Sequence, residues 1–387
     1  MGHVTLPTDD GGTERFEPSP PRDFPVRQNA PFNRVAFAAA HVVADPLAKS
    51  DPWLDASIDW DRTIAFRKSL WDLRLGVAEA MDTAQRGMGL DWPSALELIR
   101  RSVDAAKDHP GALVFCGVGT DHLSPSPDIA LSDVIDAYEE QASAVEVCGG
   151  RIIMMASRAL AAAAKGPQDY ATVYRRILGQ VKEPVIIHWL GEMFDPALAG
   201  YWGRADHDEA MEICLGILAE NADKIDGIKI SLLSKNKEIA MRRRLPEGVR
   251  MYSGDDFDYA ELIEGDEAGY SDALLGIFDA IAPAASAALA ALAADDKPRF
   301  REILAPTVPL SRHIFQAPTR FYKTGIVFLA WLNGQQDHFT MIGGQESARS
   351  TLHLAQLFRL ADRAGLLRDP DLACHRMATA MAMRGVN

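Results

Sequence analysis

Between residues 35 and 282, short apolar segments alternate with longer segments that read as helices. The apolar segments include Ala112–Gly119, Pro184–Leu190 and Asp226–Leu233, and each is a continuous run with no regular polar interruption. Continuous apolar runs are typical of parallel strands that are covered on both faces. Helical segments such as Ser94–Asp108 and His207–Asn221 separate them. The chain therefore predicts repeated βαβ units.

The number of these units favours a closed barrel. About eight strands over roughly 250 residues fit a (β/α)8 TIM barrel better than a doubly wound sheet. The last strand is expected within the apolar stretch Tyr270–Ala282. No GxGxxG motif follows the first expected strand, Val35–Val43, so the main argument for a dinucleotide-binding sheet is missing. We predict an α/β fold with a TIM barrel.

The composition changes at both ends of the barrel region. Residues 1–30 are rich in Pro, Asp, Gly and Arg without periodicity, which predicts an extended or disordered N-terminal arm. After Pro283 the remaining segments all read as helical, beginning with the Ala-rich Ala284–Ala294. The expected organisation is an arm over 1–30, a barrel over 31–283 and a C-terminal all-helical region over 284–387.

Charge and cysteine content exclude some function classes. The 387 residues carry 40 Lys and Arg against 54 Asp and Glu, a net charge of −14, which argues against nucleic-acid partners and anionic membrane surfaces. The four cysteines form no CxxC pair, so neither a zinc site nor a dithiol redox site is predicted. No apolar run of about 18 residues is present to cross a membrane. We expect a cytoplasmic protein and, because symmetric assemblies are common, a homodimer or homotetramer.

One lysine stands in the middle of an apolar strand, Asp226-Gly227-Ile228-Lys229-Ile230-Ser231-Leu232-Leu233. A buried ammonium costs several kcal/mol unless it is paired or neutral. A neutral amine can attack a substrate carbonyl to form an iminium, which makes cleavage, formation or dehydration next to that carbon easier. The alternative is a structural ion pair at the end of the strand.

Polar residues follow the other expected strands, at the end where barrel enzymes carry their sites. We predict Lys229, His188 and Asp255 as catalytic residues, with His188, Asp255 and Glu79 as the candidate bases. The predicted substrate-binding residues are His41, Glu79, Asp121, His122, Ser157, Arg158, Ser231 and Asp256. Ser271 and Asp272 are the corresponding residues expected for the eighth strand. Each has a plainer reading as a core histidine, a helix cap, a loop residue or an ion-pair partner.

Four motifs resemble the dihydrodipicolinate synthase/N-acetylneuraminate lyase family of class I aldolases. Gly227-Ile228-Lys229-Ile230-Ser231 is similar to the Schiff-base strand, and Arg250–Asp256 to the following strand with its Ser-Gly-Asp-Asp. Ile281-Ala282-Pro283 and Ala317–Lys323 are similar to two C-terminal segments of the family. The resemblance implies a barrel with a C-terminal helical domain, an imine-forming Lys229, and a divergent branch of the family.

The resemblance also implies an activity. It is that of a lyase acting on a 2-oxo acid or keto-sugar-type small molecule, by C–C cleavage, condensation or dehydration, with no cofactor and no metal. Family members carry a proton-shuttling Tyr at the end of the fourth strand. Here that place reads Met154-Met155-Ala156-Ser157-Arg158, and His188 is the expected replacement. Glu79 and Thr83 stand where the family has polar residues after the second strand.

Two other functions fit the same residues. A divalent-metal-dependent sugar isomerase or epimerase could use His41, Asp121, His188, Glu192 and Asp255 as ligands, although no short-range ligand spacing is present. A barrel that binds small molecules without catalysis is the third possibility, because fold alone does not fix function.

Overall fold

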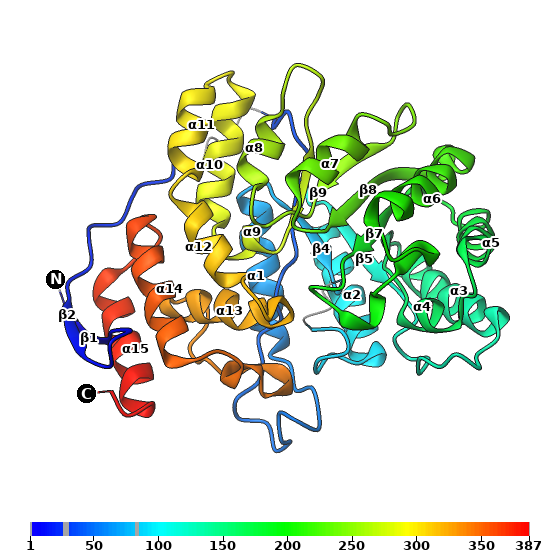
Figure 1. Cartoon of the computed structure of the whole chain (residues 1–387). Coiled ribbons are helices and arrows are strands. Elements are labelled where there is room, and N and C mark those ends of the chain that lie inside the picture. Colours follow the sequence, from blue (N-terminus) through cyan, green and yellow to red (C-terminus); the bar gives the residue numbers. More distant parts are fainter. Residues whose placement is uncertain (1, 26–30, 82–84, 387) are drawn as a thin grey trace.

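The computed structural model describes residues 2–25, 31–81 and 85–386. Its centre is a closed barrel of eight parallel strands in the order β10-β3-β4-β5-β6-β7-β8-β9 (Figure 1). This confirms the predicted TIM barrel. The strands are β3 (Ala36–Ala38), β4 (Gly76–Glu79), β5 (Val114–Val118), β6 (Arg151–Met154), β7 (Val185–Leu190), β8 (Ile225–Ser231), β9 (Arg250–Ser253) and β10 (Asp272–Leu275).

Helices follow the strands and cover the barrel. They are α1 (Trp60–Asp72), α2 (Trp92–Lys107), α3 (Leu131–Val147), α4 (Arg158–Ala163), α5 (Pro167–Leu178), α6 (His207–Glu220), α7 (Lys235–Arg242), α8 (Tyr259–Glu264), α9 (Ile277–Ala280) and α10 (Ala282–Ala293). Local chemistry sets their starts. Helix α2 begins at Trp92, two residues before the expected start, because the Asp91 carboxylate accepts a hydrogen bond from the backbone N–H of Ser94.

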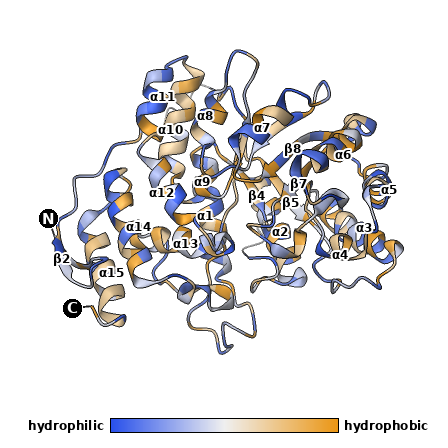
Figure 2. Ribbon diagram, in the orientation of Figure 1, coloured by the Kyte–Doolittle hydropathy of each residue, from blue (hydrophilic) through white to orange (hydrophobic). Residues whose placement is uncertain are grey.

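The remaining helices form the C-terminal region, α11 (Lys297–Leu304), α12 (Thr307–Ile314), α13 (Tyr322–Leu332), α14 (Thr351–Arg363) and α15 (Pro370–Met383). Figure 1 shows α14 and α15 on the side of the molecule opposite α3–α6. Helix α10 is coloured hydrophobic along its length in Figure 2, and nearly all its residues are buried. No helix of the described residues is long and apolar enough to cross a membrane.

The eighth strand lies within the expected stretch, but the two polar residues assigned to its mouth end do not stand there. Ser271 and Asp272 stand at the beginning of β10, where Asp272 accepts a hydrogen bond from the Val35 N–H at 2.7 Å. They therefore lie at the opposite end of the barrel from the mouth, and their placement at the mouth was wrong. A short buried strand followed directly by two apolar helices gives one continuous apolar run, so periodicity could not locate the boundary.

Residues 4–16 form an antiparallel pair of strands, β1 (Val4–Pro7) and β2 (Thr13–Phe16), within the expected arm. Val4 and Leu6 are buried, and Phe16 packs edge-on against Phe358 of α14 at 5.7 Å between ring centroids. Tertiary burial orders a segment whose composition alone does not predict structure. Residues 26–30 of the arm lie outside the described part of the chain.

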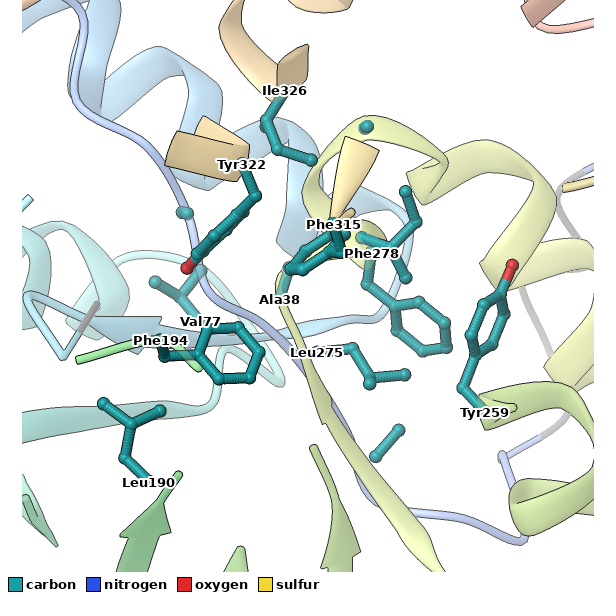
Figure 3. Packing of buried hydrophobic residues seen from close by; sticks show 14 of the residues in the cluster. Ala38, Val77, Leu190, Phe194, Tyr259, Leu275, Phe278, Phe315, Tyr322 and Ile326 are labelled. Atoms are coloured by element: carbon teal, nitrogen blue, oxygen red, sulfur yellow. The ribbon is translucent and has the colours of Figure 1, made fainter. Parts of the chain in front are cut away.

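The C-terminal region reaches over its own barrel mouth. Phe194, from the loop after β7, lies 6.4 Å from Phe315 and 6.1 Å from Tyr322 between ring centroids, and the latter two rings stack at 4.3 Å. We call Phe194, Phe315 and Tyr322 the aromatic roof. Figure 3 shows Tyr322 and Phe315 above Leu275, with Phe194 at about the level of Leu275. The roof joins a loop of the barrel to helices that follow it by more than a hundred residues.

Candidate active site

Lys229 projects from β8 into the barrel. It pairs in register with His188 on β7 and with Tyr252 on β9. Successive side chains along a strand point to opposite faces. Ile228 and Ile230 pack in the hydrophobic cluster between the barrel and its helices, whereas Tyr252, the partner of Lys229 in register, packs in the cluster inside the barrel. Lys229 therefore points inward. The lysine is 6% exposed, so its amine lies at the wall of the barrel with little solvent around it.

The backbone of Gly254 lies directly against this lysine. A Cβ added to Gly254 would come 2.8 Å from Lys229 Cε and also overlap the Ser231 hydroxyl. Real Cβ atoms do not approach neighbours so closely, so only glycine fits. The Ser-Gly-Asp-Asp sequence therefore shapes the space beside Lys229.

His188 is the nearest titratable neighbour on β7. Its Nε2 lies 3.3 Å from the Ser231 hydroxyl, and its Nδ1 is buried with no hydrogen-bond partner among the described residues. Burial lowers the pKa of His188 well below its usual range, and the charge of Lys229 lowers it further. At neutral pH the imidazole is therefore neutral and able to accept a proton.

Asp255 and Asp256 follow Gly254 and have different surroundings. The Asp255 Oδ1 accepts hydrogen bonds from the N–H groups of Phe257 and Asp258 at 2.8 and 3.1 Å, whereas its Oδ2 is buried without a hydrogen-bond partner among the described residues. Burial raises the pKa of Asp255. The Asp256 Oδ1 instead accepts a hydrogen bond from the Ile277 N–H at 2.9 Å, which ties β9 to α9.

A small cavity of about 50 Å³ opens at the ends of β5 and β6. Asp121, Ser157 and Arg158 line it, as does Asp195, which accepts a hydrogen bond from Arg158 Nε at 2.5 Å. Lys229 and His188 do not line it. Its lining residues are Arg86, Gly119, Thr120, Asp121, Leu123, Pro125, Met155, Ala156, Ser157, Arg158 and Asp195.

Met155 connects the cavity to the lysine. Met154 pairs with Ile187, so the next residues along these strands, Met155 and His188, stand at the same level of the barrel wall. His188 is in turn in register with Lys229. The cavity and the amine therefore share one stretch of inner wall, with Met155 and His188 between them.

Three predicted residues have partners elsewhere. Glu79 is fully buried in an ion pair with Arg67 at 2.9 Å and accepts a further hydrogen bond from Ser102 Oγ. His41 is buried against Asp279, at 2.9 Å from Nδ1, and Gln336, at 3.1 Å from Nε2. His122 lies at the outer edge, 3.3 Å from Glu140. Thr83 falls outside the described residues.

Sequence reasoning missed Arg86. This fully buried side chain pairs with Asp121, donates to the Gln141 amide oxygen at 2.8 Å and donates to the Gly117 carbonyl at 2.8 Å. Burial is the main cause that lowers its pKa, against the carboxylate of Asp121. No local pattern around residue 86 distinguishes it from an ordinary loop arginine.

The segment after β6 contains no tyrosine, but two tyrosines from other parts of the chain bond to its backbone. Tyr201 OH accepts a hydrogen bond from the Ser157 N–H at 3.0 Å, and Tyr138 OH donates one to the Met155 carbonyl at 2.5 Å. Burial raises the pKa of both phenols, which keeps them neutral. Neither phenol lines the cavity. Both bond to the backbone of residues that do line it, and so they hold that backbone in place.

Within residues 2–25, 31–81 and 85–386, no group of three or more His, Cys, Asp or Glu side chains is arranged to hold a metal ion. The five residues considered for a metal-dependent isomerase are therefore not gathered into one cluster.

The closed barrel with its C-terminal helices has the fold of solved dihydrodipicolinate synthase structures. Dihydrodipicolinate synthase from Aquifex aeolicus is similar at a TM-score of 0.63 and 12% identity, covering 86% of this chain and 99% of that chain. The protein from Bacillus clausii is similar at 0.62 and 16%, covering 85% and 96%. The chloride-inhibited protein from Acinetobacter baumannii, complexed with pyruvate, is similar at 0.60 and 15%, covering 86% and 99%.

These likenesses show the fold. The family is shown by sequence: the model described as "Protein of unknown function (DUF993)" matches residues 4–386, and the chain belongs to that family. No curated protein matches the sequence.

Proposed function

We propose that the protein is a lyase of the class I aldolase type, which forms an imine between Lys229 and a 2-oxo acid or keto-sugar-type small molecule. The observation that carries the proposal is the position of the Lys229 amine inside the barrel, beside a neutral His188 and against the glycine of the Ser-Gly-Asp-Asp turn. The fold of the dihydrodipicolinate synthase structures supports it.

The reaction begins with attack of the neutral amine on the substrate carbonyl carbon. The resulting carbinolamine loses water to give an iminium, which accepts the electron pair of a neighbouring C–C or C–H bond. C–C cleavage, condensation and dehydration are all open to such an intermediate. The surroundings of Lys229 determine whether its amine is neutral, because desolvation lowers the pKa of a lysine.

Two groups are available to move protons in this scheme. The Nδ1 of His188 and the Oδ2 of Asp255 are both buried without a hydrogen-bond partner among the described side chains. An unsatisfied buried polar atom is costly, and a substrate hydroxyl or water would remove that cost. We assign His188 and Asp255 the role of bases that carry protons, and the cavity at Ser157 and Arg158 the binding of the rest of the substrate.

Borohydride trapping tests the proposal. The full chain is incubated with sodium borohydride and one oxo compound at a time, from a panel of pyruvate, 2-oxobutyrate, dihydroxyacetone and fructose, and is then mapped by peptide mass. We expect a reduced adduct on Lys229 with at least one compound and none in Lys229→Arg.

Lys323 is the matched control within the same chain. It is also a buried lysine, 1% exposed, but its Nζ donates a hydrogen bond to the Ala39 carbonyl at 2.8 Å. Modification of Lys323 or of surface lysines, with Lys229 unmodified across the panel, would contradict the proposal. Assembly as a homodimer or homotetramer and a cytoplasmic location belong to the same proposal, and light scattering of the purified chain measures the assembly.

A further inference from the structure

Glu238 is a buried carboxyl group that the chemistry above does not use. It lies on α7, on the outer side of the barrel, and is 1% exposed. Its Oε2 accepts a hydrogen bond from Ser253 Oγ at 3.1 Å, and its Oε1 accepts one from Ser271 Oγ at 2.7 Å. A carboxyl group is seldom buried at this depth without a role or a charged partner.

Among the described residues, no charged side chain forms an ion pair with Glu238. Arg242 on the same helix is directed to Asp266 at 2.9 Å and to the Ser271 hydroxyl at 3.5 Å. Asp255, from the turn after β9, adds a negative charge on the other side. Burial, together with Asp255, raises the pKa of Glu238 to about 8, against the hydroxyl groups and Arg242, so the carboxyl is mostly protonated at neutral pH.

Ser253 links this carboxyl to the site. Its hydroxyl donates to Glu238 and accepts a hydrogen bond from the Asp255 N–H at 3.3 Å. The next bonds of the same turn are those from Phe257 and Asp258 to the Asp255 carboxylate. Gly254, inside this turn, is the residue whose backbone lies beside Lys229. The hydrogen bonds of Ser253 to Glu238 and to the Asp255 N–H therefore fix the backbone on either side of Gly254.

We propose that Glu238 is a positioning residue, which acts through Ser253 to hold the turn of residues 253–258 against Lys229. The inference deepens the proposed function and rests on it for its purpose, but it concerns the state of Lys229 with no substrate bound. A neutral Glu238 leaves this turn in place. An ionised Glu238 repels Asp255 and displaces the turn from Lys229.

The test measures the reactivity of Lys229 against pH. The full chain is treated with formaldehyde and cyanoborohydride between pH 6 and pH 9.5, and methylation is measured by peptide mass relative to the exposed Lys165. Above a pH of about 8, the value at which Glu238 ionises, we expect the ratio of Lys229 to Lys165 to fall in the wild-type chain. In Glu238→Gln it should stay flat, at least about three-fold higher than in the wild-type chain at the alkaline end.

Two serine variants separate positioning from a general effect on the fold. Ser253→Ala and Ser271→Ala each remove one hydroxyl group from Glu238, but only Ser253 also bonds to the Asp255 N–H. We expect Ser253→Ala to abolish the alkaline fall in the ratio of Lys229 to Lys165. In Ser271→Ala the fall should remain but begin at a higher pH, because the lost hydrogen bond lowered the pKa of Glu238. Glu212→Gln, which removes an exposed carboxylate paired with Arg244, should leave the wild-type profile unchanged.

Superposable profiles for the wild-type chain and Glu238→Gln would overturn the inference. A Lys229 that formaldehyde does not modify at any pH would overturn it too. Failure of every oxo compound to form an adduct, with the pH effect present, would overturn only the proposed function. The two outcomes are therefore distinguishable.

Discussion

At the scale of single residues, the site is defined by what surrounds Lys229. The same residue type in a solvated strand would be an ordinary ammonium, with a pKa of about 10.4. Here one neighbour is a histidine whose pKa is lowered by burial, and another is a glycine that leaves no room for a Cβ. The chemistry therefore depends on two residues that carry no charge at neutral pH.

Gly254→Ala tests this packing. The added Cβ would overlap Lys229 Cε and the Ser231 hydroxyl, so the lysine must move. We expect adduct formation at Lys229 to fall by about ten-fold or more, since misplacement of a reacting group by about 1 Å can cost two orders of magnitude. Borohydride trapping measures it.

Gly216→Ala is the matched control for that substitution. Gly216 lies within α6, and a Cβ added there meets no atom within 4 Å. Adduct formation should be unchanged, because alanine favours the helix by about 0.5–1 kcal/mol without altering packing. Equal effects of the two substitutions would show that the space beside Lys229 is not what matters.

At the scale of elements, the aromatic roof joins parts of the chain that are distant in sequence. Phe194 comes from the β7–α6 loop, Phe315 follows α12, and Tyr322 begins α13. Gly276 lies beneath them, and a Cβ there would come 2.8 Å from Phe315 and 3.0 Å from Tyr322. The C-terminal helices thus close part of the mouth that a bare barrel would leave open to water.

Phe194→Ala removes one side of the roof. We expect a loss of about 3–5 kcal/mol in the free energy of unfolding, as for other buried Phe→Ala changes, measured by urea denaturation. We also expect faster hydrolysis of any imine on Lys229, because water reaches it more easily. Phe194→Leu, which keeps an apolar group of similar bulk, should restore most of both. A Phe194→Ala chain with wild-type stability would show that the rings contribute no packing energy.

At the scale of the whole molecule, the barrel and the C-terminal helices share buried polar contacts. Lys323 of α13 donates to the Ala39 carbonyl after β3, and His41 joins Asp279 to Gln336. Burial alone would raise the pKa of Asp279, but His41 and Lys323 hold it below its usual value. Such buried contacts are costly to break one at a time.

Native-state hydrogen exchange tests whether the two parts unfold together. We expect peptides from β3 and from α13 to exchange with the same free energy of opening, because separating the parts would expose Lys323, Asp279 and the apolar α10 together. Exchange of α13 at a much lower free energy than β3 would show that the C-terminal region opens as a separate unit.

The sequence by itself determined the barrel and the place of its lysine. Continuous apolar runs between helices are a local pattern that predicts buried strands, and Lys229 stands in one of them. The Ser-Gly-Asp-Asp turn beside Lys229 was likewise visible, since consecutive strands of such a barrel are neighbours in space.

Only the tertiary structure decided which polar residues meet. Glu79 and His41 are at strand ends as predicted, but Glu79 is paired with Arg67 and His41 with Asp279. Arg86 reaches the cavity from a loop, and Glu238 bonds to Ser253 from a helix outside the barrel. Ser271 and Asp272 lie at the opposite end of the barrel. The periodicity of a sequence indicates which face of one segment is buried. It does not indicate which side chains pair, because the partners stand tens to hundreds of residues apart in the chain. The sequence therefore located the amine, and the packing of the whole chain determined its surroundings.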